Sequence, residues 1–281
     1  ILCGGDAAKE SWRFIILDSR LPQAVTALLC GSALAVSGLL LQTYFNNYLA
    51  DPSILGISSG ASFGVGVVML ILGGSVGIGS LSFSGFLAVL VGAVIGSLLV
   101  MSVLLFFSSL VKDSLTLLII GIMIGYITSS VISLLNFFAT AEGVHSYVIW
   151  GLGTFGGVSS AQLPFFSATI IIGLIGTILL IKPLNALLLG ERYATNLGIN
   201  VRHTRNYILL TVGLLTACVT AFCGPIAFIG LAVPHISRLL LGSSNHSILL
   251  PFTLLTGSVM ALLCNLACIL PGSGGVLPLN A

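Results

Sequence analysis

The chain has 281 residues, of which 57% are hydrophobic and only 6% are charged, and its mean hydropathy is +1.20. Because soluble domains carry about a quarter charged residues, this composition excludes an ordinary soluble fold. The net charge of +2 comes from dispersed basic residues, which argues against a nucleic-acid partner. Membrane lipid is therefore the expected surrounding.

Apolar runs of membrane-spanning length follow one another along the chain. They lack the alternation typical of barrel strands, and lipid offers the backbone no hydrogen bonds, so they predict transmembrane helices. We expect an all-α fold, a polytopic bundle forming one transmembrane domain over residues 1–281. The predicted apolar runs cover residues 21–45, 53–73, 83–111, 115–139, 162–181, 206–223, 226–241 and 248–270.

The basic residues predict the orientation of the bundle. If the run that begins at Leu21 leads from outside to inside, six of the nine Lys and Arg residues fall in cytoplasmic turns. The other three lie outside among acidic residues, so this orientation satisfies the positive-inside rule. The residues expected in the cytoplasm are Lys112, Lys182, Arg192, Arg202, Arg205 and Arg238.

Glycine pairs at i, i+4 predict close helix packing within the chain, since small residues let helix backbones approach. The pairs are Gly60 with Gly64, Gly92 with Gly96, and Gly121 with Gly125.

Most catalytic chemistry is excluded. No G-x-x-x-x-G-K-[ST] phosphate loop occurs, so ATP would have to be hydrolysed by another polypeptide. The four histidines lack metal-ligand spacing, so we expect no metal site, and no serine has a base and an acid to activate it. All seven acidic residues fall at span ends or in loops. The expected absence of buried carboxylates argues against the alternative function, an ion-coupled secondary transporter or channel.

A charged, amphipathic segment at residues 183–205 stands out because the other loops are short. Glu191 to Leu197 can form a short helix with Gly190 and Gly198 as hinges. Such a helix suits docking onto another protein, although an ordinary interfacial loop is the alternative.

Two prolines mark a second unusual region. Gly224–Pro225 separates two apolar runs and Pro234 interrupts the second, which predicts a short or broken span lining a cavity where freed carbonyls find partners. For His235, which follows Pro234, a packing role is the favoured interpretation.

Segment 183–205 resembles the coupling-helix region of the FecCD family of ABC permeases, which import iron siderophores, haem and vitamin B12. Further motifs similar to the family's occur in the same order over essentially the whole chain. They are RLP (20–22), SGLLLQ (37–42), FNNYLADP (45–52), LGISSGA (55–61), WGLG (150–153), GG (156–157) and CGPIAFIGLAVPHISR (223–238).

The resemblance implies a non-enzymatic permease in the bacterial inner membrane that works by alternating access. It implies a homodimer, two cytoplasmic ATPases that bind ATP and Mg²⁺, and a periplasmic or surface substrate-binding protein. This chain itself would hold no cofactor. The expected cargo is a metal chelate, with a ferric siderophore first, then haem or cobalamin. The family has about ten helices, so the first and last are expected to be missing from this sequence.

The resemblance also implies roles for single residues. Coupling to the ATPase would use Gly190, Glu191, Arg192, Tyr193, Ala194, Thr195, Asn196, Leu197 and Gly198. The cytoplasmic gate would comprise Asn47, Leu49 and Ser114, although Asn47 could instead only cap a helix end. Arg20 would dock the binding protein, while Gln23 and Ile269 stand where the vitamin B12 member has arginines.

Pathway-lining residues are expected on the runs 21–45 and 115–139. The candidates are Gln42, Thr128, Ser129 and Ser133. Hydroxyls in a span can instead bond back to the preceding turn, which is the alternative for the last three.

Overall fold

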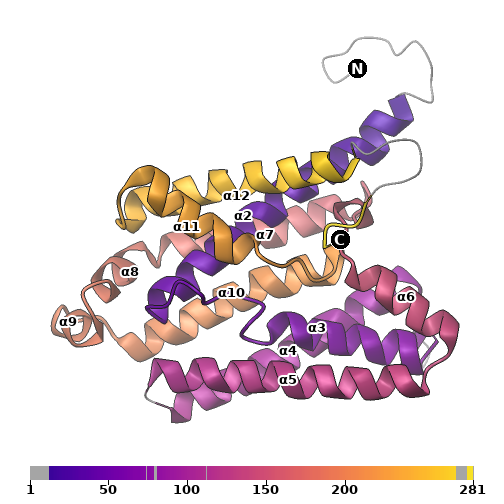
Figure 1. The fold of residues 1–281 in the computed structure, drawn as a ribbon, viewed down its shortest axis with the longest axis horizontal. Coiled ribbons are helices and arrows are strands. Elements are labelled where there is room, and N and C mark those ends of the chain that lie inside the picture. Colours follow the sequence, from indigo (N-terminus) through magenta and orange to yellow (C-terminus); the bar gives the residue numbers. More distant parts are fainter. Residues whose placement is uncertain (1–12, 74, 79–80, 112, 270–276, 281) are drawn as a thin grey trace.

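The computed structural model describes residues 13–73, 75–78, 81–111, 113–269 and 277–280. The predicted all-helical bundle is confirmed, with one small β-hairpin added (Figure 1). The elements in chain order are η1 (Ile15–Arg20), α2 (Leu21–Tyr44), α3 (Ile57–Gly66), η2 (Val67–Ile71), β1 (Ser75–Ile78), β2 (Leu81–Ser84), α4 (Phe86–Leu110), α5 (Ser114–Phe138), α6 (Ala141–Gly151), η3 (Phe155–Gly157), α7 (Leu163–Ile178), α8 (Ile181–Leu187), α9 (Glu191–Asn196), α10 (Val201–Cys223), α11 (Ile229–Leu241) and α12 (His246–Ile269).

Each predicted apolar run contains a helix. Five helices in the described part of the chain are long and apolar enough to span a membrane, and the bent pair α7–α8 could form a sixth span. Two shorter apolar helices, Ile57–Ile71 and α11, account for the remaining runs. The run 162–181 was predicted as one span, but it ends at Ile178 and turns by 51° into α8.

The sequence predicted neither α6 nor the β-hairpin. The helix α6 has only 11 residues, too few to span a membrane, and begins where the Thr140 hydroxyl accepts a hydrogen bond from Gly143 N. The strands β1 and β2 pair antiparallel between η2 and α4, with Ser75 opposite Ser84.

The bundle has two distinct ends in Figure 1. At the left, which we call the α9 end, lie α8, α9 and the first turn of α10. At the right, which we call the α6 end, lie α6, the start of α2 and the last turn of α12. The elements that carry Lys182, Arg192, Arg202 and Arg205 meet at the α9 end, as the charge distribution predicts. Lys112 lies outside the described residues.

The first long helix, α2, is buried over most of its length and packs against α12, α11 and α10. Glycines allow its closest approaches. A methyl group added at Gly31 would overlap the carbonyl oxygen of Gly257 in α12, and one at Gly38 would overlap that of Gly230 in α11. These two contacts were not foreseen from the sequence, because their glycines lack i, i+4 partners.

The predicted glycine pairs do provide close packing within the chain. Gly60 and Gly64 of α3 lie against Gly96 and Gly92 of α4, and a methyl group at any of the four would overlap the facing helix. The pair Gly121 and Gly125 instead faces residues 55–59 at the start of α3.

Replacing Gly38 with Ala should destabilise the bundle, because the added methyl group meets backbone that cannot rotate away. Overpacking of this kind costs roughly 1–3 kcal/mol. Thermal unfolding in detergent, followed by size-exclusion chromatography, should show a lower midpoint for Gly38→Ala. The matched control is Gly151→Ala, where the added methyl group has open space. Equal midpoints for the two variants would show that the α2–α11 approach is not a tight constraint.

Candidate coupling and gating sites

The predicted coupling helix is present as α9, which begins at Glu191 and ends at Asn196. Gly190 and Gly198 flank it with φ angles of +99° and +83°, values that side-chain-bearing residues rarely adopt. The prediction of a short helix between two glycine hinges is therefore confirmed, and the helix ends one residue earlier than expected.

One side of α9 packs against the bundle, and its other side chains are exposed to solvent. Ala194 is fully buried and its carbonyl accepts a hydrogen bond from Ile199 N at 3.1 Å. Tyr193 and Leu197 are 51% and 59% exposed, so this charged segment presents two large apolar side chains. The remaining predicted coupling residues, Gly190, Glu191, Arg192, Thr195, Asn196 and Gly198, are also exposed.

Two arginines at the start of α10 fix α4 beside it. Arg205 donates to the carbonyls of Val111 (2.9 Å) and Ser108, and Arg202 donates to that of Ser109 (3.1 Å). Guanidinium groups here meet the unpaired carbonyls and negative dipole end of α4. The arginines that predicted the cytoplasmic side therefore also have a structural function.

The predicted gate residues Asn47 and Leu49 lie on a loop after α2, residues 45–52, which we call the gate loop. The Asn47 carboxamide accepts a hydrogen bond from Leu49 N at 2.9 Å, so Asn47 stabilises the turn that presents Leu49. Leu49 is 66% exposed. Between them, the ring of Tyr48 lies 4.9 Å from the guanidinium carbon of Arg238 in α11, a cation–π contact.

A buried carboxylate provides a second link between the gate loop and α11. Asp51 is only 5% exposed, so the expectation that the chain buries no carboxylate is wrong for this residue. Its side chain accepts hydrogen bonds from the backbone N and hydroxyl of Ser53. It also lies against Gly230, in the first turn of α11, where the helix dipole favours negative charge. The sequence interpretation missed the burial of Asp51 because it assumed that loop residues are solvated.

The helix α11 continues through Pro234, so the predicted interruption at Pro234 is wrong. Proline cannot donate to the carbonyl four residues earlier, which here belongs to Gly230. The Gln42 amide donates to that carbonyl (3.4 Å) and to Leu231 O (3.1 Å), while its oxygen accepts from Arg238 (2.6 Å). The expectation that freed carbonyls find partners is thereby met.

Gln42 is 2% exposed, with both ends of its amide engaged by α11. Gln42 therefore joins α2 to α11, and its pathway-lining role stays a prediction.

Two of the candidate hydroxyls on α5 bond back to the preceding turn, which is the alternative that the sequence left open. Thr128 donates to Ile124 O (2.7 Å) and Ser133 to Ser129 O (3.0 Å). Because Ser129 and Ser133 are nevertheless exposed, their pathway-lining role stays a prediction.

The gate position Ser114 opens α5 at the α9 end, directly after its N-cap, Asp113. Asp113 accepts hydrogen bonds from the backbone N and hydroxyl of Thr116, both at 3.0 Å. These bonds lower the pKa of Asp113, so the cap is charged at neutral pH.

At the α6 end, the predicted docking residue Arg20 is exposed and donates to Gln23 (3.2 Å). Gln23 in turn donates to Asn265 of α12 (2.9 Å). This chain of bonds fixes the start of α2 and, among the described residues, uses only one of the guanidinium nitrogens of Arg20.

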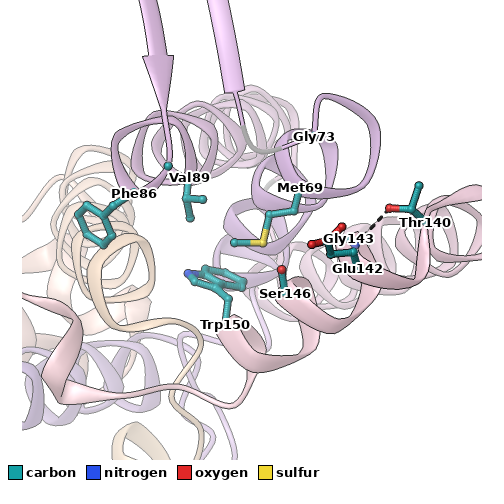
Figure 2. Close-up of a pocket in the computed structure, with 10 residues that line it drawn as sticks. Met69, Gly73, Phe86, Val89, Thr140, Glu142, Gly143, Ser146 and Trp150 are labelled. Carbon is teal, nitrogen blue, oxygen red and sulfur yellow. Dashed lines mark hydrogen bonds between the residues drawn. The ribbon is translucent and has the colours of Figure 1, made fainter.

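A cavity of about 450 Å³ also lies at the α6 end, between η2, the start of α4 and α6 (Figure 2). In Figure 2 the Trp150 ring and the Met69 side chain approach each other across it. Its other described lining residues include Phe86, Val89, Thr140, Glu142, Gly143 and Ser146. The tryptophan–glycine motif therefore borders a mostly apolar cavity with one carboxylate.

Replacing Gln42 with Leu should destabilise the α2–α11 junction, because two carbonyls and the Arg238 guanidinium lose a buried partner. Each unmade bond costs about 1–3 kcal/mol, and 1 kcal/mol corresponds to roughly 2–4 °C in the unfolding midpoint of a chain of this size. Thr216→Val is the control, because the Thr216 hydroxyl is buried without a hydrogen-bond partner. A Gln42→Leu protein as stable as the parent would contradict the assigned role.

Comparisons with known proteins agree with this architecture. The model of the FecCD transport family matches residues 2–280. The vitamin B12 import system permease proteins BtuC of Salmonella typhimurium (strain LT2) and Salmonella newport (strain SL254) are each 33% identical over 280 residues, covering 98% of this chain and 82% of theirs. An inward-facing ABC transporter provisionally classed as metal-chelate type is 30% identical, with a TM-score of 0.87 over 99% of this chain and 85% of its own. The chain therefore belongs to the FecCD transport family and is a multi-pass membrane permease of a bacterial ABC importer.

Proposed function

We propose that this permease is one half of a homodimer that imports a metal chelate by alternating access, opened by two ATPases that dock on α9. The observation that carries the proposal is the geometry of α9, a short helix held between two positive-φ glycines with Tyr193 and Leu197 exposed. Tyrosine is enriched among the residues that carry most of the binding energy at protein interfaces, and an exposed leucine beside it adds apolar area that docking would bury. The ATPases would bind ATP and Mg²⁺, and this chain would hold no cofactor.

The proposed gate lies at the α9 end, and the proposed contact with the second copy lies on α5. Leu49 would close the pathway by excluding water, with Asn47 and Ser114 beside it at the α9 end. The helix α5 is buried over only a small part of its length and exposes Ser129 and Ser133 among apolar residues. Because small and hydroxyl-bearing residues are enriched where membrane helices meet, this face supports the proposal that α5 borders a pathway completed by a second copy.

At the opposite end, the substrate-binding protein would dock through Arg20, whose guanidinium suits a carboxylate partner. The α6 end would then face outside, consistent with the arginines gathered at the α9 end.

A ferric siderophore is the first cargo candidate, followed by haem and cobalamin. The similar solved transporter is classed as metal-chelate type, which supports this cargo class. The BtuC relatives import vitamin B12, but Gln23 and Ile269 replace arginines expected of that member, which favours another chelate.

The alternative function, ion-coupled transport, draws support from one observation, the buried Asp51. That carboxylate is already engaged by Ser53 and the first turn of α11, whereas a transported ion would need it free. Uptake that persists without ATPase and collapses with the proton gradient would favour the alternative.

Replacing both Tyr193 and Leu197 with Ala should uncouple the ATPase from the permease. Loss of two interface anchors of about 2 kcal/mol each would weaken ATPase binding by roughly a hundredfold or more. The experiment uses proteoliposomes containing the permease, its ATPase and its binding protein, with ferrichrome, haemin and cyanocobalamin tested in parallel. ATP-dependent uptake should fall at least about tenfold.

Leu263→Ala is the control for this experiment, because Leu263 is similarly exposed but lies within the apolar helix α12. Unchanged uptake in the Tyr193/Leu197 variant would rule out α9 as the docking site. Absence of ATP-dependent uptake of all three compounds by the parent would contradict the proposed cargo class.

A further inference from the structure

A histidine at the α9 end joins three helices through hydrogen bonds. His246, the first residue of α12, is 1% exposed. Its Nδ1 lies 3.0 Å from the Asn185 side-chain oxygen in α8, and its backbone N donates to the same oxygen at 2.8 Å. On the other side of the ring, Nε2 lies 2.9 Å from the hydroxyl of Thr43 in α2.

The surrounding bonds define the direction of each contact. The Asn185 amide nitrogen donates to the Asn245 side chain at 3.0 Å, so the Asn185 oxygen is the acceptor. His246 Nδ1 must therefore be the donor. In the neutral ring Nε2 is then the acceptor, so the single hydrogen of the Thr43 hydroxyl is shared between Nε2 and Leu39 O, each 2.9 Å away. Both ring nitrogens are thus used, and the imidazole has one orientation that satisfies them.

The helices joined here carry the two functional segments. Thr43 lies two residues before the gate loop begins at Phe45. Asn185 lies five residues before Gly190, and the chain between them is a continuous hydrogen-bonded turn, with Leu189 N bonded to Ala186 O and Gly190 N to Leu187 O. Because α9 also packs directly against α8, a displacement of α9 would move α8 with it despite the hinge at Gly190.

An apolar side chain could fill the same volume without burying polar groups, which are costly inside a bundle. Apolar contacts, however, can slide, whereas hydrogen bonds to both ring nitrogens hold Asn185 and Thr43 at set positions. The bridge from Asn185 through His246 to Thr43 is thus a directional link between α8 and α2.

We infer that His246 is a positioning residue that transmits displacement of α9 to the gate loop through Asn185 and Thr43. This inference rests on the proposed function, in which an ATPase docks on α9 and Leu49 closes the pathway.

The test measures movement of the gate loop in the complete complex of permease and ATPase in nanodiscs. Leu49→Cys is introduced after Cys3, Cys264 and Cys268 are changed to Ala, since Cys30, Cys218 and Cys223 are buried. The rate at which a water-soluble maleimide labels position 49 is measured with and without Mg-ATP, together with the rate of ATP hydrolysis.

In the parent complex, we expect Mg-ATP to change the labelling rate at least about fivefold. His246→Phe should reduce that change to less than about twofold while ATP hydrolysis continues. His246→Gln, which keeps one donor and one acceptor, should restore part of the change. Thr43→Val removes only the hydrogen bond at the α2 end of the bridge and should reduce the ATP-dependent change to a similar extent. It replaces His246→Phe in the test if that variant does not fold.

Thr253→Val is the matched control, since Thr253 lies on the same helix and is fully buried, but its hydroxyl has no hydrogen-bond partner. The inference is overturned if His246→Phe and Thr43→Val keep the full ATP-dependent change, or if Thr253→Val loses it equally. A parent complex that hydrolyses ATP without any change at position 49 would overturn the proposed gate and, with it, this inference.

Discussion

Backbone contact between α2 and its neighbours is the constraint on which the rest of the structure depends. Gly31 and Gly38 bring α2 against the main chains of α12 and α11. Without a hydrophobic effect to separate helix from lipid, such close approach supplies much of the packing energy. It also brings Gln42 within reach of the carbonyl that Pro234 leaves free. The tolerance of a proline within α11 and the position of the gate loop both follow from this approach.

The gate loop is connected to the bundle at several points, each of a different chemical kind. Tyr48 stacks on Arg238, Asp51 lies against the first turn of α11, and Thr43 bonds to His246 just before the loop begins. The neighbouring Leu49 remains exposed. A loop with a fixed frame and one free apolar side chain is suited to opening and closing without loss of its fold. The same bundle end carries α9, so the proposed ATPase-docking helix and the proposed gate lie at one end of the bundle.

Hydropathy and glycine spacing were sufficient to predict the all-helical bundle, its apolar runs and close helix packing at the glycine pairs, because these signals are local in sequence. The helix α9 was predictable because two glycines and a charged segment mark it. The roles of the buried polar groups could not be predicted in this way. Asp51, Gln42 and His246 each acquire their role from a partner on another helix, between 61 and 203 residues away for the His246 contacts. Spacing along one helix carries no record of such partners, so Asp51 was taken as solvated, and the bonds that Gln42 and His246 make to other helices were not predicted.

The packing of α2 against α12 also bears on how the protein is made. Spans leave the ribosome in chain order, so α2 enters the membrane long before the helix that covers it is synthesised. Until α12 arrives, Gly31, the hydroxyl of Thr43 and the amide of Gln23 lack their partners on α12. During that interval the small and polar face of α2 that later contacts α12 stays uncovered within the bilayer, so this face must tolerate lipid or other spans before its native partner is present.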